Sequence, residues 1–135
     1  MPQQLRLDSI RKLAAEHLPR AYAPYSQFRV SAVVVAKSGR SYVGVNVENS
    51  AYPLSRCAEQ VAVGAMVTGG DREIELVLIH STSSPPATPC GACRQIISEF
   101  AGPDTPVICV NDAGEERRYT IGELLPAAFK LDGSR

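Results

Sequence analysis

Residues 28–47 read FRVSAVVVAKSGRSYVGVNV, and this stretch decides the fold class. Phe28 to Ala36 is rich in valine, which is typical of a buried strand. Ser38 and Gly39 are turn residues, and the alternation of valine with other residues from Ser41 to Val47 is typical of a second strand. The stretch therefore predicts two strands that pair as an antiparallel hairpin.

An amphipathic helix is expected upstream of this hairpin. Its apolar residues fall on one helical face: Leu7, Ile10, Leu13, Ala14 and Leu18. Pro19 ends the helix, because a proline ring cannot continue a helix without a steric clash. A loop over residues 22–26 then leads into the hairpin.

Predicted helices and strands alternate downstream of the hairpin. Helices are expected over 57–67 and 91–100, and strands over 74–79, 107–110 and 117–120. Thr120 and Glu123 have the spacing of a capping box, and a short last helix is expected to begin at Leu124. This order predicts an α/β fold, a three-layer α-β-α sandwich with a mixed five-stranded sheet, in a single domain over residues 1–135.

Composition and charge restrict the class of partner. The chain has 135 residues, of which 44% are hydrophobic, enough for one domain with a hydrophobic core. Its 14 basic and 14 acidic side chains give a net charge of zero, unlike the basic surface that holds a nucleic-acid backbone. A small neutral or weakly charged ligand is therefore expected, and a nucleic-acid partner is not.

The sequence predicts a cytoplasmic protein. No apolar stretch is long enough to span a membrane, so no membrane partner is expected. Arg6 and Asp8 interrupt the N-terminal region early, unlike a secretory signal. Because the cytoplasm is reducing, the 4 cysteines are expected to be metal ligands or thiols rather than disulfides.

Three short segments carry metal-binding or reactive residues: NVEN at 46–49, CAE at 57–59 and PCGACRQ at 89–95. Cys90 and Cys93 lie at the start of a predicted helix, so their sulfurs can face one point, and the positive helix end favours thiolates. A Cys-x-x-Cys pair alone is weak evidence, because structural zinc sites and redox motifs share it. The CAE segment makes the combination far more specific.

Together the three segments resemble the tetrameric cytidine deaminase family. The resemblance extends from about Tyr22 to Phe129 and includes APYS at 23–26 and ELLP at 123–126. It implies the cytidine deaminase-like fold and a role in pyrimidine salvage. The implied reaction is hydrolytic deamination of cytidine and 2′-deoxycytidine to uridine and 2′-deoxyuridine, with release of ammonia.

The resemblance implies one catalytic zinc ion per chain, held by Cys57, Cys90 and Cys93. Three thiolates leave the fourth tetrahedral position to a water molecule, which zinc makes acidic enough to react near neutral pH. Glu59 would lie beside the metal without ligating it. It would carry protons to the pyrimidine ring and to the leaving amine.

The resemblance also assigns the nucleoside pocket. Asn46 and Glu48 would bind the ribose, since an amide and a carboxylate together can hold sugar hydroxyls. Both are expected on one side of the second strand. Phe28 would pack against the pyrimidine ring, and Ala58 would contact the same ligand. These assignments favour a nucleoside over a free base.

Two aromatic residues are assigned to contacts between subunits. By resemblance, Tyr52 would lie near a subunit interface, and Phe129 would reach into the pocket of a neighbouring subunit. The implied assembly is a homotetramer with shared active sites. The residues alone predict only ordinary apolar contacts.

The charge of the metal site raises a question that the sequence leaves open. Three thiolates around one divalent zinc carry a net charge of −1, which makes the metal a poorer Lewis acid. Members of the family often have an arginine directly after the catalytic glutamate, where this chain has Gln60. Arg56 and Arg94, which flank the zinc ligands in sequence, are expected to compensate the charge.

Three other functions compete with this hypothesis. A deaminase on the same scaffold could act on an aminopyrimidine antibiotic such as blasticidin S, which Gln60 and the GVNV segment at 44–47 mildly favour. A structural zinc module would need no Glu59, and a thiol oxidoreductase would leave Cys57 unexplained.

The remaining cysteine and the histidines are expected to have no part in the metal site. Cys109 lies in an apolar strand and is interpreted as a small buried hydrophobic residue. If it were a fourth ligand, the site would be closed to water and non-catalytic. His17 and His80 lack ligand spacing to any motif and are interpreted as structural.

Overall fold

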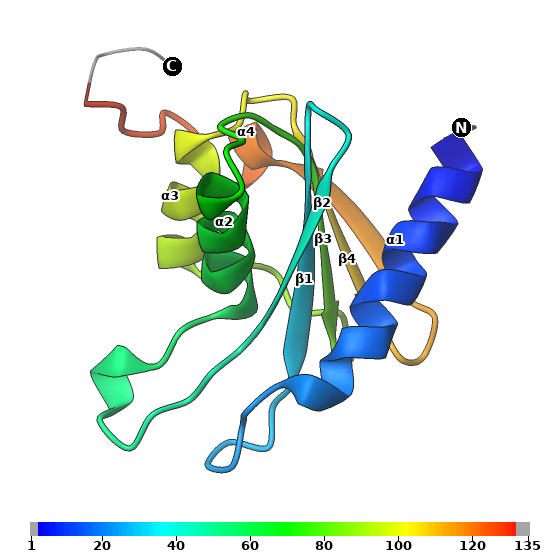
Figure 1. The fold of residues 1–135 in the computed structure, drawn as a ribbon, viewed down its shortest axis with the longest axis vertical. Coiled ribbons are helices and arrows are strands. Elements are labelled where there is room, and N and C mark those ends of the chain that lie inside the picture. The colour runs from blue at the N-terminus through cyan, green and yellow to red at the C-terminus, as the bar shows by residue number, and fades with distance from the viewer. Residues whose placement is uncertain (1–2, 132–135) are drawn as a thin grey trace.

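The computed structural model describes residues 3–131, which form a five-stranded sheet covered by helices on both faces (Figure 1). The strands are β1 (Val30–Ala36), β2 (Ser41–Val45), β3 (Ile74–Ser81), β4 (Pro106–Asn111) and β5 (Glu116–Thr120). They lie in the order β2-β1-β3-β4-β5, with β3 and β4 parallel and all other neighbours antiparallel. The mixed sheet and the β1–β2 hairpin are therefore confirmed.

The helices form the two outer layers. They are α1 (Gln3–His17), α2 (Ala58–Thr68), α3 (Gly91–Glu99) and α4 (Ile121–Leu124), with short 3₁₀ turns η1 (Leu18–Arg20) and η2 (Tyr52–Leu54). Figure 1 shows α1 on one face of the sheet and α2 and α3 side by side on the other. This arrangement confirms the three-layer α-β-α sandwich.

Strand β1 contributes to a hydrophobic core on each face of the sheet, because successive side chains of a strand point to opposite faces. All its residues are buried. Val33 and Val35 pack with α1, whereas Ala32 and Val34 pack in the core that contains residues of α2 and α3. The valine-rich sequence thus marks a central strand with no solvent-facing side.

Gly44 on β2 allows α2 to lie unusually close to the sheet. A Cβ atom at this position would lie 2.4 Å from both the Ala58 carbonyl oxygen and the Ala62 nitrogen. A larger residue would push the first turn of α2 away from the strand. That turn carries the CAE segment, so the glycine helps to place it.

Several element ends differ from the sequence prediction. Strand β1 begins at Val30 rather than Phe28, and β2 ends at Val45 rather than Val47. The Asn46 side chain explains the early end, because its Oδ1 accepts the Val30 N–H at 2.9 Å in place of a backbone partner. Asn46 and Glu48 therefore follow β2 instead of lying within it.

The two ends of the chain also depart from expectation. Helix α1 ends at His17, and the 3₁₀ turn η1 continues it from Leu18, so Pro19 lies inside a tighter turn where an abrupt end was expected. Helix α4 begins at Ile121 and not at Leu124, because Thr120 is its N-cap. The capping box with Glu123 is confirmed.

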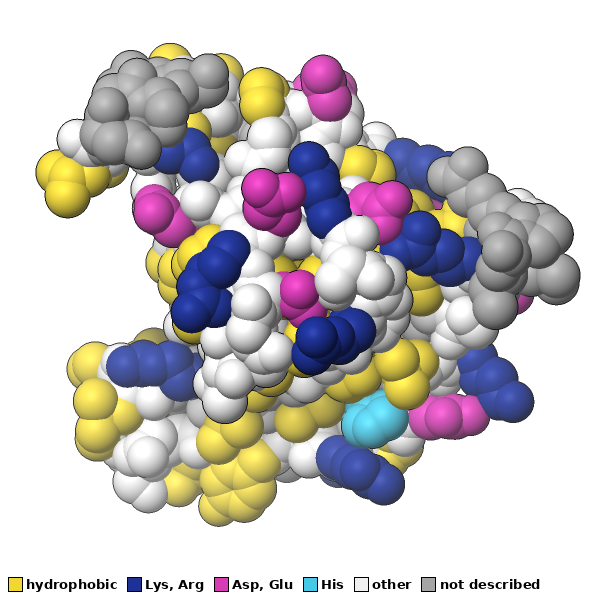
Figure 2. Space-filling view, turned by 45° about the horizontal axis from the view of Figure 1, so that its top comes forward, with side chains coloured by type: hydrophobic (Ala, Val, Ile, Leu, Met, Phe, Trp, Pro, Cys, Tyr) yellow, Lys and Arg dark blue, Asp and Glu magenta, His cyan; other side chains and the backbone are white. Residues whose placement is uncertain are grey.

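Charged side chains of both signs are dispersed over the surface. On the face shown in Figure 2, Lys and Arg alternate with Asp and Glu instead of gathering into one basic patch. Among residues 3–131, no helix combines the length and apolar character needed to cross a membrane.

Candidate functional site

Three cysteine sulfurs meet where the N-terminal ends of α2 and α3 come together. Cys57 and Cys90 are the N-cap residues of the two helices, and Cys93 lies in the first turn of α3. The Sγ atoms of Cys57 and Cys90 are 4.0 Å apart, and those of Cys90 and Cys93 are 3.3 Å apart. All three sulfurs lie within 4.8 Å of one another.

These distances fit a tetrahedral metal ion. Sulfurs bound at about 2.3 Å to one zinc ion at tetrahedral angles lie about 3.8 Å apart. The observed separations of 3.3 and 4.0 Å fall on either side of that value. Three ligands of this kind leave one coordination position for water or substrate, as catalytic zinc sites do.

The protonation of the cluster also favours a cation. A hydrogen bond from Cys93 lowers the pKa of Cys57 to about 7, whereas the hydrogen bond to Cys57 and burial raise the pKa of Cys93. The thiolate form of Cys57 is thus favoured, and the thiolate form of Cys93 is disfavoured. A divalent metal ion takes the place of the shared protons and makes three thiolates compatible.

Glu59 is the second residue of α2 and lies in the same site. Glu59 is only 5% exposed, and this burial raises the pKa of its carboxyl group. A carboxyl group with a raised pKa can accept and return a proton more readily near neutral pH. Its position suits an acid–base group beside the cysteines.

A cavity of about 310 Å³ opens beside the cysteines, within the size range of small-molecule sites. Its lining includes nine of the residues singled out in the sequence: Phe28, Asn46, Glu48, Tyr52, Arg56, Cys57, Ala58, Glu59 and Cys90. Segments that are far apart in sequence therefore meet in one pocket. The cavity is also lined by Ser26, Ser55 and Thr88, for which no role was expected from the sequence.

Asn46 and Glu48 are bonded to the loop that precedes β1. Asn46 Nδ2 donates to the Phe28 carbonyl at 2.8 Å. Glu48 Oε1 accepts the backbone N–H groups of Tyr25 at 3.0 Å and Ser26 at 3.2 Å. Both side chains thus organise the wall of the cavity that they line.

In the part of the chain that the structure describes, the expected charge compensation by Arg56 and Arg94 involves no hydrogen bond to the sulfurs. Beside the larger effect of Cys93, the charge of Arg56 helps to lower the pKa of Cys57. Arg94 donates to the carbonyls of Pro89 at 2.8 Å and Leu124 at 2.9 Å, and so connects α3 to α4. Arg56 donates to backbone carbonyls of residues 53 and 55. Within residues 3–131, neither guanidinium group is hydrogen-bonded to a cysteine sulfur.

The Gln60 side chain reaches the cluster. Its Nε2 donates to Cys93 Sγ at 3.6 Å, so a neutral amide stands beside the thiolates. Gln60 follows Cys57 by one helical turn, which places it near the cluster, but the sequence does not predict its contact with Cys93 on the other helix. Hydrogen bonds of this kind orient metal ligands.

A family model described as "Cytidine and deoxycytidylate deaminase zinc-binding region" matches residues 6–109 of the chain. The chain belongs to the cytidine and deoxycytidylate deaminase family. A cytidine deaminase of Sporosarcina psychrophila is 41% identical over 126 residues, which cover 91% of this chain and 93% of that relative. One from Mycoplasma genitalium is 36% identical, covering 94% and 98% respectively.

Solved structures agree with this membership of the deaminase family. The crystal structure of a cytidine deaminase from Burkholderia pseudomallei has a TM-score of 0.86 and 36% identity, covering 90% of this chain and 98% of that one. A cytidine deaminase from Mycobacterium tuberculosis has a TM-score of 0.78 and 32% identity, covering 93% and 98%. The fold prediction is therefore confirmed by relatives as well as by topology.

Zinc is the cofactor of this deaminase family member. The matched region is a zinc-binding region, and Cys57, Cys90 and Cys93 form its cluster able to hold a metal ion. Cys109 is fully buried in the core that contains α2 and α3, as expected of a small hydrophobic residue. His80 is bonded through Nε2 to Asp112 at 2.6 Å, outside the cysteine cluster.

Phe129 does not line the deaminase cavity of its own chain. It is 60% exposed, and its carbonyl accepts a hydrogen bond from Gln95 at 3.2 Å. Tyr52 lies at the cavity and is 81% exposed. Both aromatic rings are thus available for contacts outside the described chain.

Proposed function

We propose that this chain catalyses the hydrolytic deamination of cytidine and 2′-deoxycytidine to the corresponding uridines, with release of ammonia. The observation that carries this proposal is a buried acid, Glu59, beside a three-cysteine cluster at the end of a nucleoside-sized cavity. A structural zinc site has no use for a buried carboxyl group, and a dithiol oxidoreductase has no use for the third cysteine.

Cys57, Cys90 and Cys93 would hold the zinc ion, which would lower the pKa of a coordinated water molecule and so supply the nucleophile at neutral pH. Glu59 takes one proton from the attacking water and delivers it to ring N3 as oxygen bonds to C4. It then transfers the second proton to the amino group, and the C4–N bond breaks to release ammonia. The carboxylate ends in the protonation state in which it began.

The cavity supplies groups that match the other parts of a nucleoside. Phe28 offers an aromatic face for the pyrimidine, and Ala58 adds an apolar contact beside the metal site. Asn46 and Glu48 offer a donor and acceptors for sugar hydroxyls. These groups favour cytidine and 2′-deoxycytidine over an antibiotic nucleoside such as blasticidin S.

Ammonia release from a panel of aminopyrimidines tests the proposed substrate. We expect cytidine and 2′-deoxycytidine to react with kcat/KM values within about tenfold of each other, because that difference corresponds to about one weak hydrogen bond. Cytosine, which has no sugar to occupy the Asn46 and Glu48 positions, should be at least about a hundredfold poorer. Blasticidin S as the best substrate would instead favour the antibiotic deaminase.

We further propose that the chain assembles as a homotetramer with shared active sites. The supporting observations are the exposed Phe129 and Tyr52, which are large apolar groups on the surface of one chain. A tetramer of 14.5 kDa chains has a mass of about 58 kDa. In such an assembly Phe129 would complete the pocket of a neighbour.

Co-expression of two damaged chains tests the shared site. Phe129→Ala should raise KM by about tenfold for the loss of one aromatic contact, and Glu59→Gln should remove turnover. Mixed tetramers should regain some sites of normal KM, in which one chain supplies Glu59 and its neighbour supplies Phe129. Separately purified variants, assayed together before their subunits exchange, should not. Light scattering should give about 58 kDa. A fully active monomer would refute shared sites and leave the zinc chemistry intact.

The proposed location is the cytoplasm, and the proposed role is pyrimidine salvage. Residues 57, 90, 93 and 109 are free cysteines, and the first three must stay reduced to bind metal. A reducing compartment supports this chemistry.

A further inference from the structure

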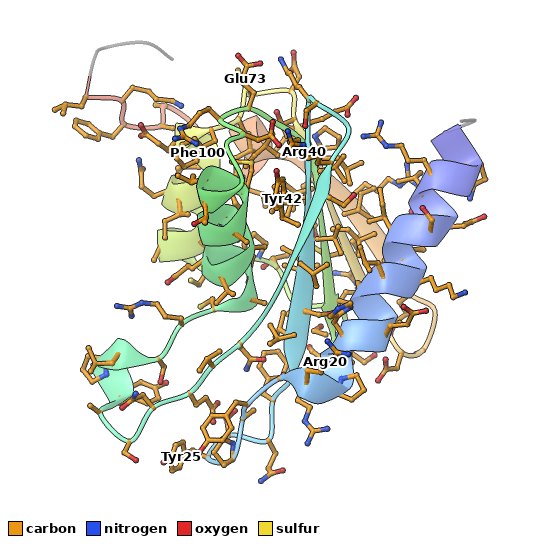
Figure 3. The ribbon with its side chains drawn as sticks, in the orientation of Figure 1. Arg20, Tyr25, Arg40, Tyr42, Glu73 and Phe100 are labelled. Atoms are coloured by element: carbon orange, nitrogen blue, oxygen red, sulfur yellow. The ribbon has the colours of Figure 1, made fainter. Side chains whose placement is uncertain are left out.

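The loop before β1 and the segment after β2 form one hydrogen-bonded unit. Tyr22 N–H donates to the Asn46 carbonyl at 2.9 Å, and Glu48 N–H donates back to the Tyr22 carbonyl at 2.9 Å. Figure 3 shows Tyr25 farther along this loop, beyond the end of the sheet where β1 begins. The loop is thus attached to the two residues proposed to bind the sugar.

The Ser26 hydroxyl is the third hydrogen-bond donor to the Glu48 carboxylate. It donates to Glu48 Oε2, and this bond is the main cause that lowers the pKa of Glu48. A carboxylate has about four acceptor positions. The loop occupies three of them through Tyr25 N–H, Ser26 N–H and the Ser26 hydroxyl, which leaves Oε2 one position for a ligand hydroxyl.

The same hydroxyl also fixes Phe28. The Phe28 N–H donates to Ser26 Oγ at 3.0 Å, and the Phe28 carbonyl accepts from Asn46 Nδ2 at 2.8 Å. Both polar groups of the Phe28 backbone are therefore bonded to side chains that line the cavity. One serine connects the aromatic residue to the carboxylate.

The conformation of the loop requires these contacts. Gln27, between Ser26 and Phe28, has a φ of 63°, in the left-handed region that non-glycine residues avoid. Its N–H donates to the Ala23 carbonyl at 3.0 Å, and its Nε2 donates to the Pro24 carbonyl at 3.2 Å. Surrounding contacts thus hold a strained residue in place, as is common beside ligand sites.

We infer that Ser26 is a positioning residue for nucleoside binding, which orients the Glu48 carboxylate toward a single sugar hydroxyl and holds Phe28 against the base. The inference rests on the proposed function. Ser26 acts on parts of the substrate that do not react, so it serves the ground state and the transition state alike. Its loss should therefore raise KM and leave kcat unchanged.

Steady-state kinetics of Ser26→Ala test this inference. KM for cytidine should rise about tenfold, the effect of losing one hydrogen bond to a charged group, while kcat stays within about twofold. Ser26→Thr keeps the hydroxyl and should restore KM. Ser50→Ala is the matched control, because Ser50 Oγ bonds to the Tyr25 hydroxyl of the same loop at 2.7 Å but not to Glu48.

A double-mutant cycle shows whether Ser26 acts through Glu48. In a Glu48→Ala background, Ser26→Ala should add much less than its tenfold effect in the wild type. An equal effect in both backgrounds, an unchanged KM, or loss of zinc from Ser26→Ala would overturn the inference. A wild-type chain that releases no ammonia from any nucleoside would instead refute the proposed function.

Discussion

Replacement of Glu59 by glutamine should lower kcat for cytidine by about ten-thousandfold or more, while the protein keeps its zinc. Glutamine keeps the shape and hydrogen-bonding capacity of the side chain but cannot carry a proton. One carboxyl group serves the attack of water, the protonation of N3 and the departure of the amine. General acid–base catalysis of one step contributes about a hundredfold to ten-thousandfold to the rate. The loss of a group that serves several steps should therefore lower the rate by an amount at the upper end of this range.

Zinc analysis and kinetics on the same preparation check this prediction. Cytidine binding should survive in Glu59→Gln, because Phe28, Asn46 and Glu48 are unchanged. Glu73→Gln is a matched control: Glu73 is a surface residue paired with Lys37 at 3.7 Å, and its loss should leave kcat within about twofold. Near-normal turnover in Glu59→Gln would refute the proton-transfer role, and loss of zinc would make Glu59 a ligand or a structural residue.

The fold could be predicted from sequence because its decisive elements have strong local patterns. The valines of β1 predicted a buried strand, and Ser38 and Gly39 predicted the turn of the hairpin. The ends of the elements could not be predicted as well. Asn46 ends β2 through a side-chain bond to Val30, and such a long-range contact has no periodic signal.

Some features of the candidate site could likewise be predicted from the sequence, and others could not. Its cysteines and Glu59 occur in short segments whose spacing relative to helix N-termini is visible in the sequence. The hydrogen bonds of Gln60 and Arg94 are not visible there, because an arginine close in sequence to a cysteine can point to a backbone carbonyl. Compensation of the site's charge by Arg56 and Arg94 therefore stays a prediction.

Ser26 shows a further limit of sequence analysis. The APYS segment that contains it supported the family resemblance, but nothing in the segment predicts a contact with Glu48, 22 residues away. The contact lies next to a left-handed conformation at Gln27, where no glycine marks the turn. Only the assembled loop reveals the carboxylate and its donors together.

Replacement of Cys93 by alanine should abolish both zinc binding and turnover. Cys93 is buried, and its sulfur lies within 4.8 Å of the other two, so its loss leaves two ligands and removes the geometry of the site. We expect bound zinc below about a tenth of the wild-type content and turnover reduced at least ten-thousandfold. Cys109→Ala is the matched control, because Cys109 is an equally buried cysteine outside the cluster. It should cost about 1 kcal/mol of stability and leave zinc content unchanged.

The most direct test of a zinc-dependent deaminase is the rate of ammonia release from cytidine, measured against bound zinc in protein stripped of metal and reloaded stepwise. The rate should rise in proportion to bound zinc and level off at about one zinc ion per chain, as expected of a single three-cysteine cluster. Cys93→Ala should show no such rise, and Cys109→Ala should follow the wild type. Full ammonia release by the metal-free chain, or loss of zinc from Cys109→Ala, would contradict the account.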